Sequence, residues 1–283
     1  MMKIEAPSIT YTEAIENCLK GITGDNKLRE KLENSKSTLE EQFSSYSALA
    51  STEDLFTISP AEKDAIFVDL ETSDLLKLYK NYFSRQEKTA REKVYDVLMV
   101  AAEEKCPFCG GIGVPSNLDH YLPQAKGRFP QFSILPLNLI PACRDCNMGA
   151  KGSGFASSKG EQILHPYLDN TRYFEKQWIY AKYIESVGNE PAAIKYFVSP
   201  PQDWEDYQKA RVEKYFEVFD LARRYSIQAS TVLCTYLKQI DNLLSRGDCK
   251  QEAKKTILQF NIEDIPFVNH WKRVMCLELM ECL

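Results

Sequence analysis

A chain of 283 residues with 44% hydrophobic and 11% aromatic side chains can bury one large core or two modest ones, which excludes a disordered protein. The N-terminus has no apolar signal segment and no stretch approaches eighteen unbroken apolar residues, so we expect a cytoplasmic protein with no membrane contact. The formal net charge of −5 excludes a protein coated in basic surface for nucleic acid.

The first region of the chain, residues 1–103, is expected to be helical. Residues 11–50 place Ala14, Ile15 and Cys18 at helical spacing on one face, with a break at Gly21 and Gly24. Residues 73–84 and 86–103 predict two further helices, and the second leads directly into Cys106.

The second region, residues 104–155, contains two Cys-x-x-Cys pairs. The first pair is Cys106 and Cys109, and the second is Cys143 and Cys146. Two such pairs can present four thiolates in a tetrahedron, the ligand set of a closed structural zinc site. Nine cysteines are an odd number in a long chain, so we expect the other five to be reduced thiols.

Between the two pairs, short extended segments alternate with loops. Residues 118–122 end a strand that contains Asp119 and His120, and residues 137–141 form a second extended segment that contains Asn138. Residues 143–150 suit a short helix. The order predicts a ββα unit.

The third region, residues 156–283, begins with two strand-like segments at 178–186 and 193–199 around a Gly188-Asn-Glu-Pro turn, which predict a β-hairpin. Helices are expected at 203–224, 227–245, 248–260 and 266–282. The fold class is therefore α+β: mostly helical, with a central zinc-stapled ββα unit and a C-terminal β-hairpin plus helices.

Aromatic residues in and near the expected hairpin allow two interpretations. They could stack on exposed bases, or they could pack in a core, as aromatic residues of hairpins more often do. The residues are Trp178, Tyr180, Tyr183, Tyr196, Phe197 and Trp204.

The central order of signals is a Cys pair, Asp119-His120, Asn138 in a Pro-Leu-Asn-Leu context, then Cys-x-x-Cys-Asn147 and the basic Lys151. This order resembles the HNH endonuclease family, whose catalytic unit is a ββα-metal fold. The resemblance covers about 46 of the 283 residues and none of the flanking regions. The third signature position is Asn147 rather than His. An amide oxygen is a harder ligand than imidazole, so it suits Mg²⁺ or Mn²⁺.

The resemblance implies a role for each site residue. His120 would be the general base that activates water, and Asp119 and Asn147 would bind one catalytic divalent ion, Mg²⁺ or Mn²⁺. Asn138 would fix the loop that orients His120. Zn²⁺ on the four cysteines would be structural.

Basic residues near this unit are candidates for contact with DNA. Lys105 to Lys159 include six basic and two acidic residues, a net charge of +4, so the remaining chain sums to −9 and we expect a focused anion site. The resemblance implies that Lys151 contacts a phosphate. Lys126 and Arg128 could bind DNA or simply be solvated.

The implied function is metal-dependent DNA hydrolysis; the alternative is a zinc-stabilised nucleic-acid or protein-binding module without catalysis. Small HNH proteins with helical flanks also resemble nuclease subunits of bacterial anti-phage defence systems, including the Septu type that pairs with an ATPase, and stand-alone restriction enzymes. We therefore expect DNA as substrate, and the acidic flanks to form either a homodimer or a dock for a partner ATPase. The apolar side chains of 266–282 are an argument for such a dock; closing the protein's own core is the alternative. His165 is not assigned as a ligand, because no cysteine is close to it in sequence.

Overall fold

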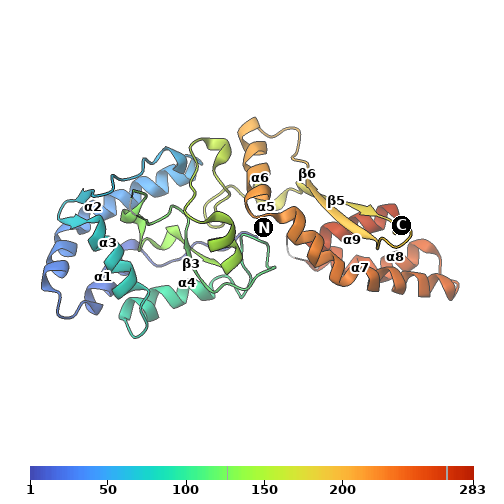
Figure 1. Ribbon diagram of the computed structural model, residues 1–283, viewed down its shortest axis with the longest axis horizontal. Helices are drawn as coiled ribbons and strands as arrows, with labels where there is room; N and C mark the ends of the chain where they lie inside the picture. Colours follow the sequence, from blue (N-terminus) through green and yellow to red (C-terminus); the bar gives the residue numbers. More distant parts are fainter. Residues whose placement is uncertain (126, 266) are drawn as a thin grey trace. The chain divides into compact units, whose positions relative to one another are not determined.

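The computed structural model describes residues 1–125, 127–265 and 267–283, and these form two compact units. One unit contains residues 3–169, and the other contains Met1–Met2 together with Asn170–Leu283 (Figure 1). The helical region and the Cys-x-x-Cys region expected as separate segments therefore share one compact unit. The structure is α+β, with helices and small two-stranded sheets.

The helices of the first unit begin at polar caps and bury regularly spaced apolar residues. Thr10 and Glu13 form a capping box at the start of α1, and Asp25 accepts a hydrogen bond from Leu28 N at the start of α2. Leu32, Leu39 and Tyr46 lie on the buried face of α2. The helical elements are α1 (Tyr11–Gly21), α2 (Asn26–Ser51), α3 (Thr72–Leu78), η2 (Tyr79–Phe83), η3 (Arg91–Tyr95) and α4 (Asp96–Val100), with a short turn η1 (Leu55–Thr57) after α2.

Two small antiparallel sheets belong to this unit. The pair β1 (Ile66–Phe67) and β2 (Leu70–Glu71) was not expected from the sequence. The pair β3 (Asn117–His120) and β4 (Leu139–Ala142) is centred on the expected site, with Asp119 opposite Ile140 and His120 opposite Leu139. Because side chains alternate along a strand, Asn117 and Asp119 lie on one face of β3 and His120 on the other.

A long connection between β3 and β4 packs against the N-terminal helices. It contains two short turns, η4 (Pro130–Phe132) and η5 (Pro136–Asn138), and η4 contacts α2 and α3. After β4 the chain forms a helical turn with wide π spacing, η6 (Asp145–Lys151), and later η7 (Lys159–Glu161). The N-terminal helices therefore pack against the connection between β3 and β4.

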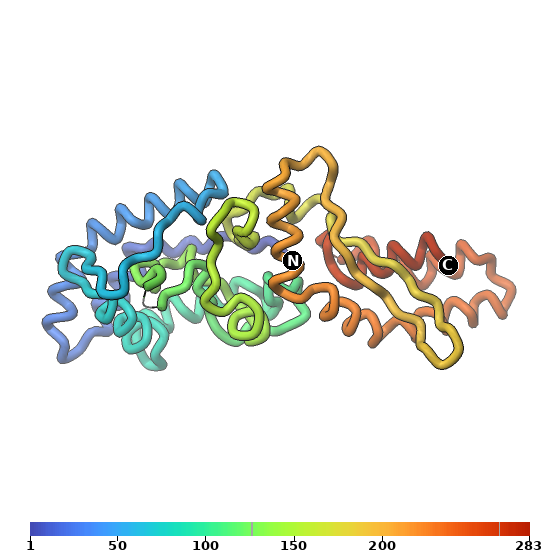
Figure 2. The backbone as a smooth tube through the Cα atoms, turned by 45° about the horizontal axis from the view of Figure 1, so that its top comes forward, coloured from blue at the N-terminus to red at the C-terminus, as the bar shows by residue number. Residues whose placement is uncertain are grey.

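The second unit places a β-hairpin against helices. Strands β5 (Ile179–Ile184) and β6 (Ala193–Val198) pair in the expected position, and β6 packs on α7 while β5 packs on α9. Figure 2 shows the hairpin, drawn in yellow, running along the orange and red helices. The helices are α5 (Arg172–Glu175), α6 (Asp206–Val218), α7 (Leu221–Ser245), α8 (Lys250–Glu263) and α9 (Trp271–Cys282).

The last helix closes the core of its own unit. Trp271, Val274, Met275 and Leu279 are buried, and α9 contacts α7, α8 and β5. The apolar surface that argued for a docking helix is therefore mostly used inside the unit, as the alternative interpretation held. Within the described residues, no helix combines the length and apolar character needed to cross a membrane.

Candidate metal centre and catalytic site

The two Cys-x-x-Cys pairs come together in the structure. The sulfur atoms of Cys106, Cys109, Cys143 and Cys146 all lie within 4.8 Å of one another, and all four residues are buried. Hydrogen bonding among the four thiols lowers the pKa of Cys109 and Cys143 and raises the pKa of Cys106 and Cys146. Four buried thiols at this spacing could hold a structural metal such as zinc.

Glycines shape the first cysteine pair into a tight loop. Gly111 N donates to Cys106 O at 3.0 Å, and Gly111 has a φ of +81°, which favours glycine. Gly113 N donates to Cys109 Sγ at 3.3 Å. A Cβ on Gly113 would lie 2.6 Å from Cys143 Sγ, so only glycine allows the two pairs to approach this closely.

His120 is held as a neutral imidazole at the end of β3. Its ring is buried, its Nε2 lies 2.9 Å from Ser133 O, and the Tyr79 ring packs edge-on with centroids 4.6 Å apart. Because a carbonyl only accepts hydrogen bonds, Nε2 carries the proton and Nδ1 has the lone pair. Burial lowers the pKa of His120 to about 4, so the ring is uncharged at neutral pH.

Asn138 fixes the connection that provides Ser133. Its Oδ1 accepts from Leu122 N at 2.7 Å, and its Nδ2 donates to Leu122 O at 3.0 Å and to Phe132 O at 3.1 Å. The side chain is fully buried. It therefore ties together the two ends of the connection, and Phe132 is the direct neighbour of Ser133.

Two residues far away in sequence support Asn138. Tyr46 Oη donates to Asn138 Oδ1 at 3.2 Å and also lies 3.2 Å from His165 Nε2. His165 Nδ1 accepts from Tyr167 N, so Nε2 has the proton and donates to Tyr46. The resulting chain of hydrogen bonds runs from His165 through Tyr46 to Asn138 in the core, and His165 is not arranged as a metal ligand.

Asp119 faces Lys151 on the other side of β3. Lys151 Nζ lies 3.2 Å from Oδ2 and 3.4 Å from Oδ1 of Asp119, and it donates to His120 O at 2.6 Å. Oδ2 is buried and receives no aligned hydrogen bond. Burial raises the pKa of Asp119 to about 6, although the Lys151 charge acts in the opposite direction, so the carboxylate is still ionised at neutral pH.

Lys151 is therefore not at the surface, where contact with a phosphate was expected. Its side chain is only 3% exposed, and its ammonium is taken up by Asp119 and a backbone carbonyl. This arrangement depends on η6 continuing past Gly149 as far as Lys151. Asn147 lies one turn earlier and donates from Nδ2 to Asn117 Oδ1 at 3.1 Å.

The helical turn η6 and strand β3 thus meet through two pairs of side chains, Asn147 with Asn117 and Lys151 with Asp119. Asn147 is half-buried, and within the described chain its Oδ1 accepts no hydrogen bond. Carboxylate and amide oxygens are the ligands that Mg²⁺ and Mn²⁺ prefer. The donor chemistry fits a hard divalent ion, but the Lys151 ammonium now balances the charge of the carboxylate.

The other two candidates for contact with DNA are Arg128 and Lys126. Arg128 is half-buried, with its guanidinium 4.9 Å from the centre of the Phe155 ring, and it forms no ion pair within the described residues. Lys126 lies outside the described residues. Arg128 is therefore free of an acidic partner among the described residues, whereas the Lys151 ammonium is paired with Asp119 in this structure.

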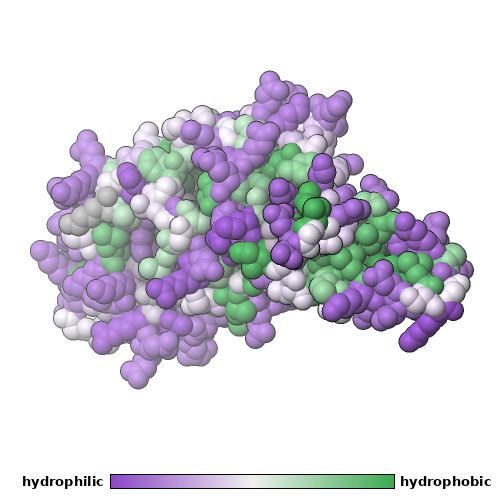
Figure 3. Space-filling model, turned by 45° about the vertical axis from the view of Figure 1, so that its right-hand side comes forward, coloured by the Kyte–Doolittle hydropathy of each residue, from purple (hydrophilic) through white to green (hydrophobic). Residues whose placement is uncertain are grey.

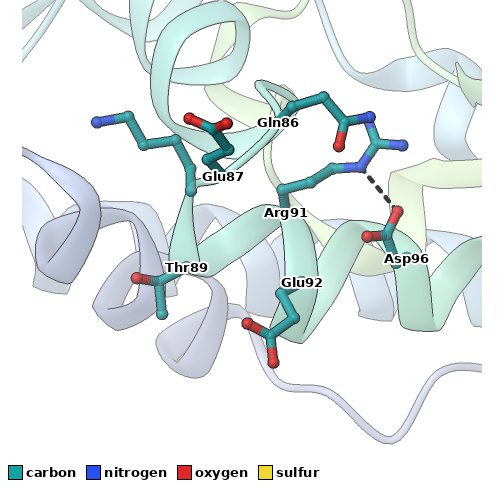
Figure 4. Close-up of a pocket in the computed structure, with 7 residues that line it drawn as sticks. Gln86, Glu87, Thr89, Arg91, Glu92 and Asp96 are labelled. Atoms are coloured by element: carbon teal, nitrogen blue, oxygen red, sulfur yellow. Dashed lines mark hydrogen bonds and ion pairs between the residues drawn. The ribbon is translucent and has the colours of Figure 1, made fainter.

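A polar pocket of about 320 Å³ opens elsewhere in the same unit, on residues 86–96 (Figure 4). Arg91 Nε pairs there with Asp96 Oδ1 at 2.7 Å. The pocket includes none of the site residues expected from the sequence. Its lining residues are Gln86, Glu87, Lys88, Thr89, Arg91, Glu92 and Asp96.

Several residues around the site were not expected from the sequence. Asn117 could have been found, because it lies two positions before Asp119 and so shares its strand face. Ser133 acts through a backbone carbonyl, which leaves no mark on residue type. Tyr46 is 92 residues away from Asn138 and has no local signal.

Comparisons with known proteins identify one clear relative. No protein-family model matches the sequence, and no solved structure matches it. Protein ea31 of Escherichia phage lambda is 35% identical over 289 residues, covering 97% of this chain and 95% of that protein. The chain therefore belongs to the family of phage lambda protein ea31.

Proposed function

We propose that this protein is a metal-dependent HNH-type endonuclease that hydrolyses phosphodiester bonds in DNA. The observation that carries the proposal is the pairing of a neutral, oriented His120 with an adjacent Asp119 whose Oδ2 lacks a hydrogen bond. Both stand on a strand–strand–helix framework closed by four cysteines. This order of two strands and a helical turn supports the proposal.

His120 would act as the general base. Its Nδ1 has the lone pair, because Nε2 donates to Ser133 O. A neutral imidazole can accept a proton from water at neutral pH, and the carbonyl then stabilises the charged ring. Asn138 would keep Ser133 in place through its bond to Phe132 O. The residues Tyr46 and His165 would support this position from the core.

Asp119 and Asn147 would bind the divalent ion, Mg²⁺ or Mn²⁺. When bound, such an ion supplies positive charge that stabilises the leaving oxygen of the phosphodiester. The buried Oδ2 of Asp119 and the unbonded Oδ1 of Asn147 are the donors that this chain provides. Zinc on the four cysteines would be structural, because all four ligand positions are taken by protein.

Lys151 would have to leave Asp119 when the ion binds, because two cations cannot share one buried carboxylate without strong repulsion. The chain around it can rearrange: Gly149, Gly152 and Gly154 lie on either side, and Gly152 has a φ of +54°. In the displaced position the ammonium could reach a phosphate of DNA. Lys151 would then serve as an internal cation that keeps Asp119 paired in the metal-free protein.

A binding module without catalysis is the second candidate function. The observation that favours it is the closed state of the site: His120 is 8% exposed and Asp119 is 4% exposed. A role in bacterial anti-phage defence or restriction, with a partner ATPase or a homodimer, stays a prediction from the resemblance alone.

Metal-dependent cleavage separates these candidates. Purified full-length protein is incubated with supercoiled plasmid and with linear DNA in Mg²⁺, in Mn²⁺ and in EDTA. The proposal predicts nicked or linear products with either ion and none with EDTA. Binding of DNA without cleavage under any of these conditions, by protein that retains its zinc, would favour the binding module.

A further inference from the structure

The outward face of the β5–β6 hairpin presents two aromatic rings and two lysines to solvent. Tyr180 is 39% exposed and Phe197 is 46% exposed, and Lys182 and Lys195 are also exposed. The opposite face, which includes Ile179, Ala181, Ile194 and Tyr196, is buried. The sequence alone could not show which aromatic residues of the hairpin are buried and which are exposed. The structure places Trp178, Tyr196 and Trp204 inside and leaves Tyr180 and Phe197 outside.

The four outward side chains are arranged in two cross-strand pairs. Tyr180 lies opposite Phe197, and Lys182 lies opposite Lys195. The aromatic rings are nearly parallel, with an interplanar angle of 26° and centroids 6.1 Å apart. Each ring therefore shows a flat face or an edge to solvent. Along its strand, each ring lies two residues from a lysine, a spacing of about 6.6 Å.

The positive charges of Lys182 and Lys195 are not neutralised by a carboxylate among the described residues. Like charges directly opposite each other on a sheet destabilise it. Among the residues that the structure describes, neither Lys182 nor Lys195 forms an ion pair with a carboxylate. Glu185 lies nearby at the end of the hairpin, but it faces the side of Tyr183, whose pKa is raised by burial and then by Glu185. An external anion would relieve this repulsion.

Exposed apolar rings beside unbalanced lysines fit one kind of ligand better than others. Hydrophobic side chains reach the surface in patches among hydrophilic ones (Figure 3). The exposure of two rings therefore does not by itself indicate a binding site. An acidic peptide would satisfy the lysines, but it offers nothing flat for two parallel rings. A single strand of nucleic acid offers both, because each nucleotide carries a phosphate and an unstacked base with a π face.

We propose that this face, defined by Tyr180, Lys182, Lys195 and Phe197, binds single-stranded DNA by stacking bases on the rings and pairing phosphates with the lysines. The choice of DNA rests on the proposed function. The face would hold a single strand of the substrate, and the site at His120 belongs to the other unit of the chain.

Binding of fluorescein-labelled single-stranded oligonucleotides to the full-length protein tests the proposal. Fluorescence anisotropy is measured on the zinc-loaded protein without added Mg²⁺ or Mn²⁺, so that cleavage does not occur. Tyr180→Leu and Phe197→Leu keep an apolar surface but remove the rings, and each should weaken binding roughly tenfold. Tyr180→Phe keeps the ring and should bind like the wild type. Unchanged affinity in both leucine variants would overturn the stacking role.

The lysines have a separate readout in salt dependence. For Lys182→Gln and Lys195→Gln, the slope of log K against log salt concentration should decrease by about 0.7 for each lysine removed. The matched control changes the same residue types on another exposed surface of the unit: Lys255→Gln and Phe260→Leu, where Phe260 is 70% exposed. The control should leave both affinity and slope unchanged. Equal losses in the control and the hairpin variants would contradict the assignment.

The outcome is independent of whether the protein cleaves. Hairpin-dependent binding by a protein that never cuts would support this face and contradict the nuclease. Cleavage that needs His120, together with wild-type binding in every hairpin variant, would overturn this face and leave the nuclease standing. Tighter hairpin-dependent binding to duplex DNA or to an acidic peptide than to the single strand would also contradict the proposal.

Discussion

Lys151 and Asp119 form a buried ion pair, with Nζ 3.2 Å from Oδ2 and both side chains at most 4% exposed. The pair joins the helical turn η6 to strand β3, directly beside His120. Its cation stands where the proposed function requires a divalent ion to act. This one contact therefore links the stability of the metal-free protein to its response to Mg²⁺ or Mn²⁺.

Removing the Lys151 charge should lower the stability of the protein without a divalent ion and make that stability depend on Mn²⁺. Lys151→Met keeps most of the side-chain volume but leaves the Asp119 carboxylate buried and unpaired. Without added divalent ion, the free energy of unfolding of the zinc-loaded protein should therefore fall by about 3 kcal/mol. Binding of Mn²⁺ to the vacated carboxylate should restore part of that loss. Denaturant unfolding with and without Mn²⁺ measures both.

Lys159→Met is the matched control for this variant. Lys159 pairs with Asp54 at 3.0 Å near the surface, where both side chains are about one-third exposed. Its removal should lower the free energy of unfolding by less than about 1 kcal/mol, with no response to Mn²⁺. Similar losses in the two variants, with neither responding to Mn²⁺, would remove the proposed link.

The four-cysteine cluster should contain about one zinc ion per chain. Cys106→Ser or Cys143→Ser should lose the metal and give insoluble or unfolded protein, because the free energy of zinc binding contributes directly to folding. Metal analysis of the purified protein, with circular dichroism of the variants, measures this. A folded wild-type protein without zinc would contradict it.

Gly113 tests the same cluster without touching a ligand. Gly113→Ala should lower zinc content and thermal stability, since its Cβ would lie 2.6 Å from Cys143 Sγ. Gly149→Ala is the control, because nothing lies within 4 Å of a Cβ at that position. Zinc content equal to wild type in both variants would show that the two pairs need no such close approach.

The hydrogen bond from Tyr46 to Asn138 should matter more for cleavage than for folding. Tyr46→Phe and Tyr11→Phe each remove one buried phenol hydroxyl from the same unit, and each should cost about 1 kcal/mol of unfolding free energy. Only Tyr46→Phe should slow cleavage, because Tyr11 bonds to Gln131 O and not to Asn138. Equal cleavage rates in both variants would leave Tyr46 with a structural role alone.

The last helix should behave as part of a core. Met275→Ala should destabilise the C-terminal unit by about 2–5 kcal/mol, because Met275 is fully buried. Met280→Ala, on the same helix but half-buried, should cost less. Thermal unfolding measures the difference. Equal small losses of unfolding free energy in the two variants, together with dimers in light scattering, would instead favour α9 as a docking surface.

Local signals in the sequence predicted the elements that short-range chemistry determines. The spacing of Cys106, Cys109, Cys143 and Cys146 predicted the cluster, and alternation around Gly188 predicted the hairpin. Four long C-terminal helices were expected and are present, but the break between the first two lies at 219–220 and not near 226. The roles assigned to His120, Asp119 and Asn147 stay predictions, since geometry alone does not test them.

Long-range contacts were beyond the reach of the sequence. The N-terminal helices had no motif and were assigned to protein binding, yet Tyr46 and Tyr79 pack around the site from α2 and η2. The resemblance implied a phosphate contact for Lys151, and only the approach of η6 to β3 brings its ammonium to Asp119. Both differences arise from tertiary packing, which residue type and spacing do not encode.

The central claim is that His120 acts as the base of a metal-dependent nuclease, and cleavage by His120→Ala tests it most directly. Plasmid cleavage in Mg²⁺ is compared between wild type and variant, after circular dichroism and metal analysis show that fold and zinc are retained. Loss of a general base should lower the rate by about 10²–10⁴-fold. A folded, zinc-loaded His120→Ala protein that cuts DNA at the wild-type rate would contradict the claim.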